Sequence, residues 1–444
     1  MAENFDLVFK GGTIVNQDGE GEADLGVRDD RIAEIGSIGA SAAARTIDAR
    51  GLHILPGVID SQVHFREPGL EHKEDLATGS RSAVLGGVTA VFEMPNTKPA
   101  TTSANALAAK VKVASGRMHC DFAFFVGATH DNVGDLAELE RLPGAAGIKA
   151  FLGSSTGDLL IDDEATLKRI LATINRRASF HAEDEARLRE RAALQRAGDP
   201  SSHHHWRDPQ AALASTERLL RLAASAGKRV HVLHVSTAEE MALLARHKDF
   251  ASVEVTPQHL TLAAPEAYER LGTKAQMNPP LRDPHHQAGL WWGVERGVVD
   301  VLGSDHAPHT LEEKAKSYPA TPSGMPGVQT LVPVMLDHVN AGRLTLARFV
   351  DMTSAGPQRV FGIAGKGRIA VGYDADLTIV DLKQTRVIED EWIGSKCGWT
   401  PFAGHKVRGW PKGTIVRGRI AMWEGDVSEA KGAPVRFDEA LPRA

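Results

Sequence analysis

PGVIDSQVHFREPG, residues 56–69, is the stretch that decides the fold, because an apolar run ends there in a cluster of polar side chains. Residues 54–59 are apolar and rich in β-branched side chains, which predicts a buried strand that ends near His64 and Arg66. In a barrel of parallel strands the active site lies at the carboxyl ends of the strands. A lone histidine is more often a core residue, so a functional role for His64 requires partners elsewhere in the chain.

Further apolar runs follow the first, and amphipathic stretches at residues 163–177, 209–226 and 238–248 have the periodicity of helices that cover a sheet. The runs span residues 88–93, 121–128, 147–152, 178–181, 229–235, 251–255 and 298–302. Eight strands with helices between them predict an α/β fold, a (β/α)8 TIM barrel rather than an open doubly wound sheet. No Gly-x-Gly-x-x-Gly or P-loop pattern opens these helices, which argues against a nucleotide-binding sheet.

The two ends of the chain share a different pattern, in which apolar and polar residues alternate as in β-hairpins. The alternation covers residues 5–15, 23–35, 367–382 and 413–423. We therefore expect both ends to build one small β-sandwich domain, with an independent C-terminal β module as the alternative. The expected boundaries are 1–54 and 367–444 for the β domain and 55–366 for the barrel.

Composition places the chain among ordinary globular proteins, with 42% hydrophobic and 24% charged residues over 444 residues. The net charge is −6 and no long Lys/Arg block occurs, which argues against a nucleic-acid or anionic membrane partner and favours a small-molecule substrate. We find no signal sequence and no 18-residue apolar run, so we expect a cytoplasmic protein. Cys120 and Cys397 are expected to be free thiols.

Three consecutive histidines at His203, His204 and His205 invite a metal interpretation. Adjacent side chains on a loop rarely converge on one ion, and no acidic or cysteine neighbour completes a set. We therefore predict a solvated loop over residues 201–209.

Polar side chains follow several predicted strands and would meet at one rim of the barrel. They are His64, Arg66, Asn96, Lys149, His181, His234, Asp305, His306 and His309. Imidazole and carboxylate groups are suitable ligands for Zn²⁺ or a similar divalent ion. Burial would lower the pKa of a lysine at this rim, and its neutral amine could add CO₂ to become a carbamate that bridges two metals.

These segments resemble the amidohydrolase superfamily and, within it, the dihydroorotases. The resemblance extends over most of the chain and is carried by short motifs. They are VHFREPG at residues 63–69, MPNT at 94–97, IKAF at 148–151 leading into GSSTG at 153–157, NPPLR at 278–282 and GSDHAPH at 303–309. The family interconverts L-dihydroorotate and N-carbamoyl-L-aspartate in de novo pyrimidine biosynthesis.

The resemblance also implies a role for each site residue. His64 and Asp305 would bind one Zn²⁺, His181 and His234 a second, and carboxylated Lys149 would bridge the two. Asp305 would move the proton between the attacking hydroxide and the amide nitrogen. The substrate carboxylate would be held by Arg66, Asn96 and His309, and the ring by Asn278. A homodimer is expected, with aspartate transcarbamoylase as a further partner.

One position departs from the family pattern, which has a second metal-binding histidine two residues before His64. This chain has Gln62 there, on the same face of the strand as His64. An amide oxygen is a poorer ligand for zinc than imidazole. One or two zinc ions are therefore expected, with the ion at His64 in question. Gln258-His259, where relatives often carry two histidines, receives no role.

Two alternatives stay open. A hydantoinase or allantoinase would share the barrel and metals, but its ring substrate lacks the carboxylate that Arg66 would bind. A catalytically silent dihydroorotase-like partner of aspartate transcarbamoylase would explain Gln62, although such a protein would be expected to have lost several ligands.

Overall fold

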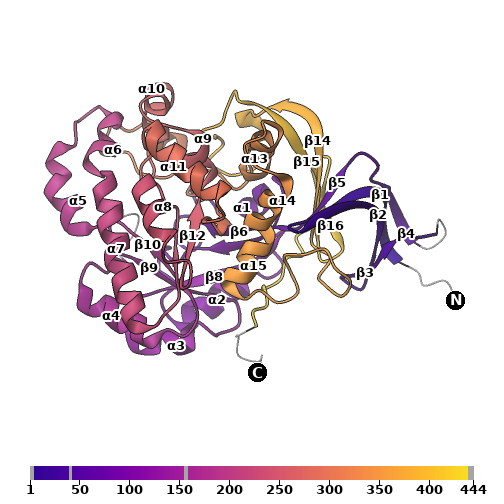
Figure 1. Cartoon of the computed structure of the whole chain (residues 1–444), viewed down its shortest axis with the longest axis horizontal. Helices are drawn as coiled ribbons and strands as arrows, with labels where there is room; N and C mark the ends of the chain where they lie inside the picture. Colours follow the sequence, from indigo (N-terminus) through magenta and orange to yellow (C-terminus); the bar gives the residue numbers. More distant parts are fainter. Residues whose placement is uncertain (1–4, 40–42, 155–158, 439–444) are drawn as a thin grey trace.

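The computed structural model describes residues 5–39, 43–154 and 159–438. Its two sheets occupy different parts of the molecule, with the barrel at one end and the β domain at the other (Figure 1). Ser155, Thr156 and Gly157 of the GSSTG motif lie outside the described residues, as do the last residues of the 367–444 segment.

The predicted barrel is confirmed as an eight-stranded parallel sheet in sequential order. Its strands are β6 (Val58–Val63), β7 (Val88–Glu93), β8 (Asp121–Gly127), β9 (Ala145–Phe151), β10 (Ala178–His181), β11 (Val230–Val232), β12 (Ala251–Val255) and β13 (Val301–Leu302). The ring closes beyond β13, where the His64 N–H donates to the His306 carbonyl at 2.7 Å. The ends of the first and last strands therefore meet.

The prediction of one strand over residues 54–59 is wrong, because the run divides between the two sheets. β5 (His53–Pro56) pairs with strands of the β domain, and β6 begins at Val58 in the barrel. Between them, a Cβ on Gly57 would lie 2.2 Å from Thr89 Oγ1 and 2.8 Å from Asp376 Cβ. Only glycine leaves room for the chain to cross at this point.

Helices cover the barrel (Figure 1). They are α1 (Leu76–Leu85), α2 (Ala104–Ala114), α3 (Leu136–Leu139), α4 (Glu164–Thr173), α5 (Glu185–Arg191), α6 (His203–Trp206), α7 (Pro209–Ala226), α8 (Ala238–Leu244), α9 (Pro257–Thr261), α10 (Glu266–Leu271), α11 (Pro284–Glu295), α12 (Leu311–Lys314), α13 (Leu331–Asn340), α14 (Leu346–Val350) and α15 (Gly356–Phe361). In the described residues, no helix is long and apolar enough to cross a membrane.

Local chemistry sets the bounds of α7, which match the predicted 209–226. The Asp208 side chain accepts from the Ala211 N–H, and Pro209 occupies the first turn, where its missing N–H is harmless. Gly227 ends the helix in the left-handed conformation at φ 63°.

The predicted solvated loop at residues 201–209 is wrong. A 3-10 turn (Pro200–Ser202) leads directly into α6, and His203 is 2% exposed. The His203 imidazole is hydrogen-bonded to Met277 and Asn278. These partners are distant in the sequence, so inspection of the neighbouring residues could not identify them.

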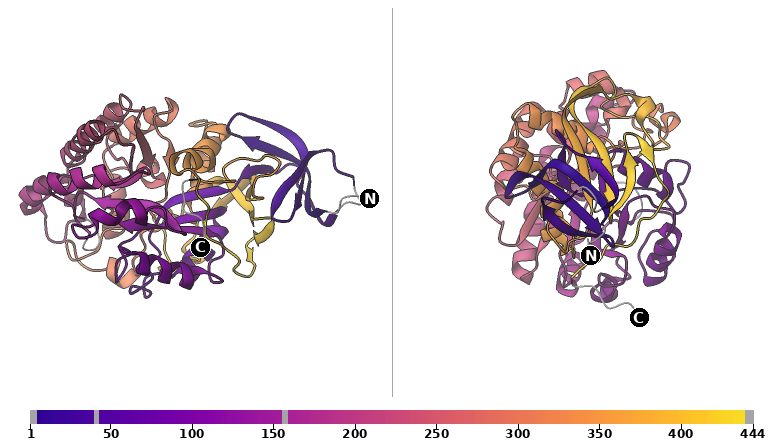
Figure 2. Two further views of the ribbon diagram at one scale, coloured as in Figure 1. Left: turned by 90° about the horizontal axis from the view of Figure 1, so that it is seen from below. Right: turned by 90° about the vertical axis from the view of Figure 1, so that its right-hand side faces the viewer.

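The second sheet confirms that both chain ends build one β domain. It is a mixed nine-stranded sheet, and its strands near the N-terminus project away from the barrel (Figure 2). The strands are β1 (Phe5–Asn16), β2 (Gly19–Arg28), β3 (Arg31–Gly36), β4 (Ala43–Asp48), β5, β14 (Leu377–Val387), β15 (Lys406–Val416), β16 (Arg419–Trp423) and β17 (Asp426–Val427). Phe9, Leu25, Ile54 and Leu377 belong to its core. The domain boundaries at residues 54 and 366 stay predictions.

A buried lysine ties the β domain to the barrel. Lys366 Nζ donates to Asp121 Oδ2 at 2.7 Å on β8, and it pairs with Asp376 just before β14. Asp374 Oδ2 lies 3.5 Å from the same amine. Burial disfavours the charged amine, but the three carboxylates outweigh it and raise the pKa of Lys366. Cys120 and Cys397 are buried free thiols, as predicted.

Lys366→Met should destabilise the protein by about 3–5 kcal/mol, because it leaves the buried Asp376 carboxylate without a cation. Asp121 keeps Arg417, and Asp374 keeps Arg31 and Arg436. Urea unfolding followed by circular dichroism measures this loss. Arg368→Met is the control, since its partner Asp18 is on the surface and the Arg368 side chain is 37% exposed. Equal stability of the two variants would contradict a structural role for Lys366.

Candidate active site

A cavity with about 370 Å³ of empty space lies at the carboxyl ends of the barrel strands. It is lined by Gln62, His64, Arg66, Lys149, Phe151, His181, His234, Asn278, Asp305, Ala307, Ser323 and Gly324. Seven of the predicted site residues are in this lining. Asn96 and His309 stand directly behind it, in contact with His64 and Arg66.

Three lining residues have backbone conformations that side chains with a Cβ rarely adopt. Arg66, His234 and Asp305 have φ values of 66°, 36° and 44°. Each follows the end of a barrel strand, so the chain turns sharply there. Such strain is of order 1–3 kcal/mol per residue and concentrates at functional sites.

His181 and His234 form a pair of nitrogens facing each other. His181 Nδ1 lies 3.0 Å from His234 Nε2, and His181 Nε2 lies 2.9 Å from Glu183 Oε2. Because a carboxylate accepts, Nε2 of His181 carries the hydrogen and its Nδ1 lone pair faces His234. Burial lowers the pKa of both histidines, so both rings are neutral.

Glu183 was not predicted, and it fixes the orientation of His181. It is fully buried, and Arg207 donates from Nε to its Oε1 at 3.2 Å. Burial would raise its pKa, but Arg207 and His181 together lower it well below the usual range for a glutamate. In the sequence, the one signal for this role is that Glu183 lies two residues after His181, a predicted metal ligand.

Lys149 lines the same cavity as these histidines and Asp305. It is 1% exposed, and its Nζ has no hydrogen-bond partner among the described residues. The amine stands 4.4 Å from the centre of the Phe151 ring. Burial lowers its pKa from 10.5 to about 7, so a large share of the amine is neutral near neutral pH.

His64, Asp305 and Gln62 line the same cavity. His64 Nδ1 lies 2.8 Å from Asn96 Oδ1, which leaves its Nε2 lone pair 3.2 Å from Asp305 Oδ1. A lone pair facing a carboxylate needs a proton or a cation between them. Gln62 Nε2 donates to the same Asp305 oxygen at 3.2 Å. Gln62 therefore places a donor, not a ligand oxygen, on Asp305.

Arg66 is a buried cation without a carboxylate. It is 1% exposed and forms no ion pair with any described residue, and Nε donates to the Pro308 carbonyl at 3.2 Å. His309 Nε2 donates to Ser323 O at 3.0 Å, so it cannot also accept from Arg66. Burial lowers the pKa of Arg66 to about 10, which still leaves it charged. The other guanidinium N–H groups remain for a ligand in the cavity.

Some predicted rim residues do not reach the cavity. His306 is 1% exposed, its Nδ1 accepts from the Gly327 N–H at 3.1 Å, and its Nε2 lies 3.5 Å from Glu74. His259, which received no role, bonds to Thr256 and to the Pro279 carbonyl.

A separate group of metal-type ligands stands outside the cavity. Glu239 Oε2 lies 3.2 Å from His286 Nδ1, and Glu239 Oε1 lies 3.6 Å from His285 Nε2. Glu239 and His285 are exposed, and the Ala238 N–H already donates to His286 Nδ1. None of these three residues lines the cavity, so an ion bound by them would add to any count of bound metal.

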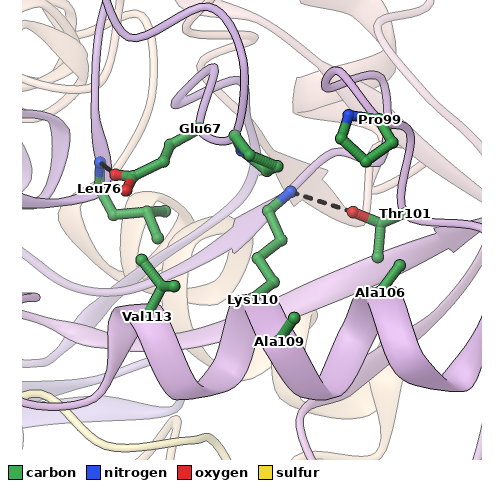
Figure 3. Close-up of a pocket in the computed structure, with 9 residues that line it drawn as sticks. Glu67, Leu76, Pro99, Thr101, Ala106, Ala109, Lys110 and Val113 are labelled. Carbon is green, nitrogen blue, oxygen red and sulfur yellow. Dashed lines mark hydrogen bonds between the residues drawn. The ribbon is translucent and has the colours of Figure 1, made fainter.

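A second cavity, between α2 and the segment after Arg66, is mostly apolar (Figure 3). Its one amine, Lys110, pairs with Glu93 and donates to Thr101 Oγ1 at 3.3 Å. Because this amine already has partners, it is not available to a ligand in the apolar cavity.

Comparison with known proteins agrees with this geometry. The sequence pattern of the Amidohydrolase family matches residues 53–421. The chain belongs to the amidohydrolase family. A dihydroorotase of Halobacterium salinarum is 40% identical over 93% of this chain and 98% of its own. An allantoinase of Rubrobacter xylanophilus is 36% identical over 95% of each chain.

Solved structures place this amidohydrolase beside enzymes that open cyclic amides. The L-hydantoinase of Arthrobacter aurescens superposes with a TM-score of 0.91 at 32% identity, over 97% of this chain and 99% of its own. The predicted family and the prediction of a cyclic amidohydrolase are confirmed. Amidohydrolases are typically metal-dependent.

The side chains present fit one metal well and a second one poorly. Neutral nitrogens on His181 and His234, with the unpartnered amine of Lys149, make a donor set that would suit zinc once the lysine is carboxylated. His64 and Asp305 would also accept a cation between them. The Gln62 amide N–H competes for Asp305, and its own oxygen is buried without a partner.

Lys149→Met should raise the free energy of unfolding of the metal-free, CO₂-free protein at and below neutral pH. Folding lowers the lysine pKa from 10.5 to about 7. The penalty for burying the amine is therefore complete below about pH 7 and disappears as pH rises towards 10.5. Denaturation between about pH 6 and pH 10 should show this gap closing. Lys168→Met, at a side chain 59% exposed, is the control. A gap that does not change with pH would contradict the shifted pKa.

Proposed function

We propose that this amidohydrolase is a dihydroorotase, which interconverts L-dihydroorotate and N-carbamoyl-L-aspartate in de novo pyrimidine biosynthesis. The observation that carries the proposal is Arg66, a buried guanidinium in the cavity without a carboxylate from the described residues. A buried charge is expensive unless it is paired, so the site is built for an anionic ligand. Dihydroorotate brings a carboxylate, and the dihydroorotase relatives support the choice.

Substrate binding is assigned to four side chains. Arg66 offers a planar fork that a carboxylate can meet with two hydrogen bonds. Asn96 and His309 are assigned to the same subsite from behind the cavity lining, through their contacts with His64 and Arg66. His309 is held by Ser323 and by Lys73, whose Nζ lies 3.1 Å from His309 Nδ1. Asn278 lies on the cavity wall and supports the ring.

The metal ligands follow the same proposal. Carboxylated Lys149, His181 and His234 would hold zinc, with His64 and Asp305 as the weaker second set. When bound, zinc would make hydroxide available near neutral pH and would polarise the amide carbonyl. Asp305 takes the proton of the attacking nucleophile and returns it to the leaving amide nitrogen. Its carboxylate is held ready for this by the Gln62 amide at 3.2 Å.

A hydantoinase or allantoinase activity is the second candidate, favoured by the solved L-hydantoinase and the allantoinase relative. Their neutral rings would leave Arg66 unpaired in the closed complex. For the chain itself we propose a cytoplasmic homodimer, with aspartate transcarbamoylase as a further partner, as the family resemblance implies.

The zinc-loaded protein should hydrolyse dihydroorotate, and Arg66→Ala should lose about 10- to 100-fold in kcat/KM. A charged hydrogen-bonded pair contributes roughly 1.5–3 kcal/mol, which corresponds to this factor. Arg66→Lys keeps the charge without the fork and should recover only part of the loss. Steady-state hydrolysis of dihydroorotate and of neutral hydantoin measures both effects.

Hydantoin is the internal control, because it has no carboxylate for Arg66. An equal loss on both substrates would contradict the assigned contact. Faster turnover of hydantoin or allantoin than of dihydroorotate by the native protein would favour the second candidate.

Gln62→His should raise the tightly bound zinc from about one to about two ions per chain, since it replaces the donor on Asp305 by an imidazole ligand. Both proteins are made with Glu239→Ala, so that the outer Glu239, His285 and His286 group adds no ion. Zinc is counted after dialysis against a mild chelator. Two firmly held ions with Gln62 present would show that the amide does not weaken the site. No zinc and no turnover would favour the silent-partner alternative.

A further inference from the structure

His203 has a place in the site that its sequence context did not predict. It begins α6, outside the barrel, yet it is 2% exposed and reaches the segment that carries Asn278. His203 Nε2 lies 3.1 Å from the Met277 carbonyl oxygen and 2.9 Å from Asn278 Oδ1. One ring nitrogen thus faces two acceptor atoms.

The Met277 carbonyl determines the protonation of His203 Nε2 and the orientation of the Asn278 amide. A backbone carbonyl can only accept, so His203 Nε2 must carry a hydrogen. The neighbouring atom of the Asn278 amide must then be its oxygen, because an NH₂ group there would face another donor. Asn278 lines the cavity, and with its oxygen committed to His203 it has only Nδ2–H donors left for a ligand.

Groups on the other side of the imidazole support the same tautomer. Trp206 Nε1 donates to Tyr318 Oη at 2.7 Å, and Tyr318 Oη lies 3.5 Å from His203 Nδ1. An indole only donates, so the tyrosine oxygen accepts and its own proton is available to Nδ1. Both aromatic rings meet the imidazole edge to face, at 5.8 and 5.9 Å between ring centres. Burial lowers the pKa of His203 to about 3, so the ring stays neutral.

We propose that His203 is a positioning residue that fixes the orientation of the Asn278 amide, so that the cavity offers N–H donors to a ring carbonyl oxygen of a cyclic amide. This rests on the proposed function for the identity of the ring. Freed from His203, the amide could turn over and present its oxygen, which repels a carbonyl. His203 therefore contributes to substrate selection without touching the substrate.

The test is a double-mutant cycle of His203→Leu and Asn278→Ala in the zinc-loaded, full-length protein. His203→Leu should raise KM for dihydroorotate roughly 3- to 10-fold, the effect of one neutral hydrogen bond, with kcat little changed. In the Asn278→Ala background, His203→Leu should have no further effect. His203→Gln, which retains an N–H donor at this position, should restore most of the affinity.

His205→Leu is the matched control, because His205 is an exposed residue of the same short helix. Thermal unfolding is recorded for every variant, so that a general loss of structure is separated from a local one. Additive losses in the cycle would overturn the proposal. So would an unchanged KM in His203→Leu, or a His203→Gln variant as impaired as His203→Leu.

The outcome is distinguishable from a failure of the proposed function. A native protein that opens hydantoin but not dihydroorotate would refute the function, and the same cycle run on hydantoin would still test the coupling. With no turnover of either ring, the cycle is measured as Kd for dihydroorotate by calorimetry. Absence of coupling there would overturn the role of His203.

Discussion

The site depends on two basic side chains, Arg66 and Lys149, that folding buries without an anionic partner from the part of the chain that the structure describes. Arg66 and Lys149 are each 1% exposed, and neither has a carboxylate partner among the described residues. Leaving such groups unpaired is unfavourable, so a fold that keeps them has a use for them. Arg66 stays charged and attracts a carboxylate. Burial lowers the pKa of Lys149 to about 7, so its amine loses the proton readily. The same burial has opposite consequences, because a guanidinium holds its proton far more strongly than an amine.

A surrounding layer of hydrogen bonds decides which atom each group presents to the cavity. Glu183 accepts the hydrogen of His181 Nε2, which leaves the Nδ1 lone pair of His181 facing His234. Asn96 Oδ1 is hydrogen-bonded to Nδ1 of His64, so the Nε2 lone pair of His64 stays available. His203 donates to the Asn278 side-chain oxygen, so the NH₂ group of Asn278 stays available. Such partners typically change metal affinity 10- to 100-fold when removed. Chemical identity alone therefore does not define this site, since each of these side chains has two different ends.

Gln62 shows how one residue can replace a metal ion as the group that holds Asp305. At its position a histidine would bring a lone pair, whereas the amide brings an N–H that satisfies Asp305 directly. Asp305 can then be held in place without an ion beside it. Under the proposed function, a site with a single metal would therefore still have the Asp305 carboxylate in place as a base.

The sequence by itself determined the barrel, the shared β domain and most of the cavity lining, because strand periodicity and the motifs around His64, Lys149 and Asp305 are local signals. It could not determine where β5 ends and β6 begins, since Gly57 matters only through Thr89 and Asp376, which are distant in the chain. It also placed His203 in solvent and His306 at the rim. Only the tertiary structure decided these, because hydrogen-bond partners such as Met277 and Gly327 are brought close by folding alone.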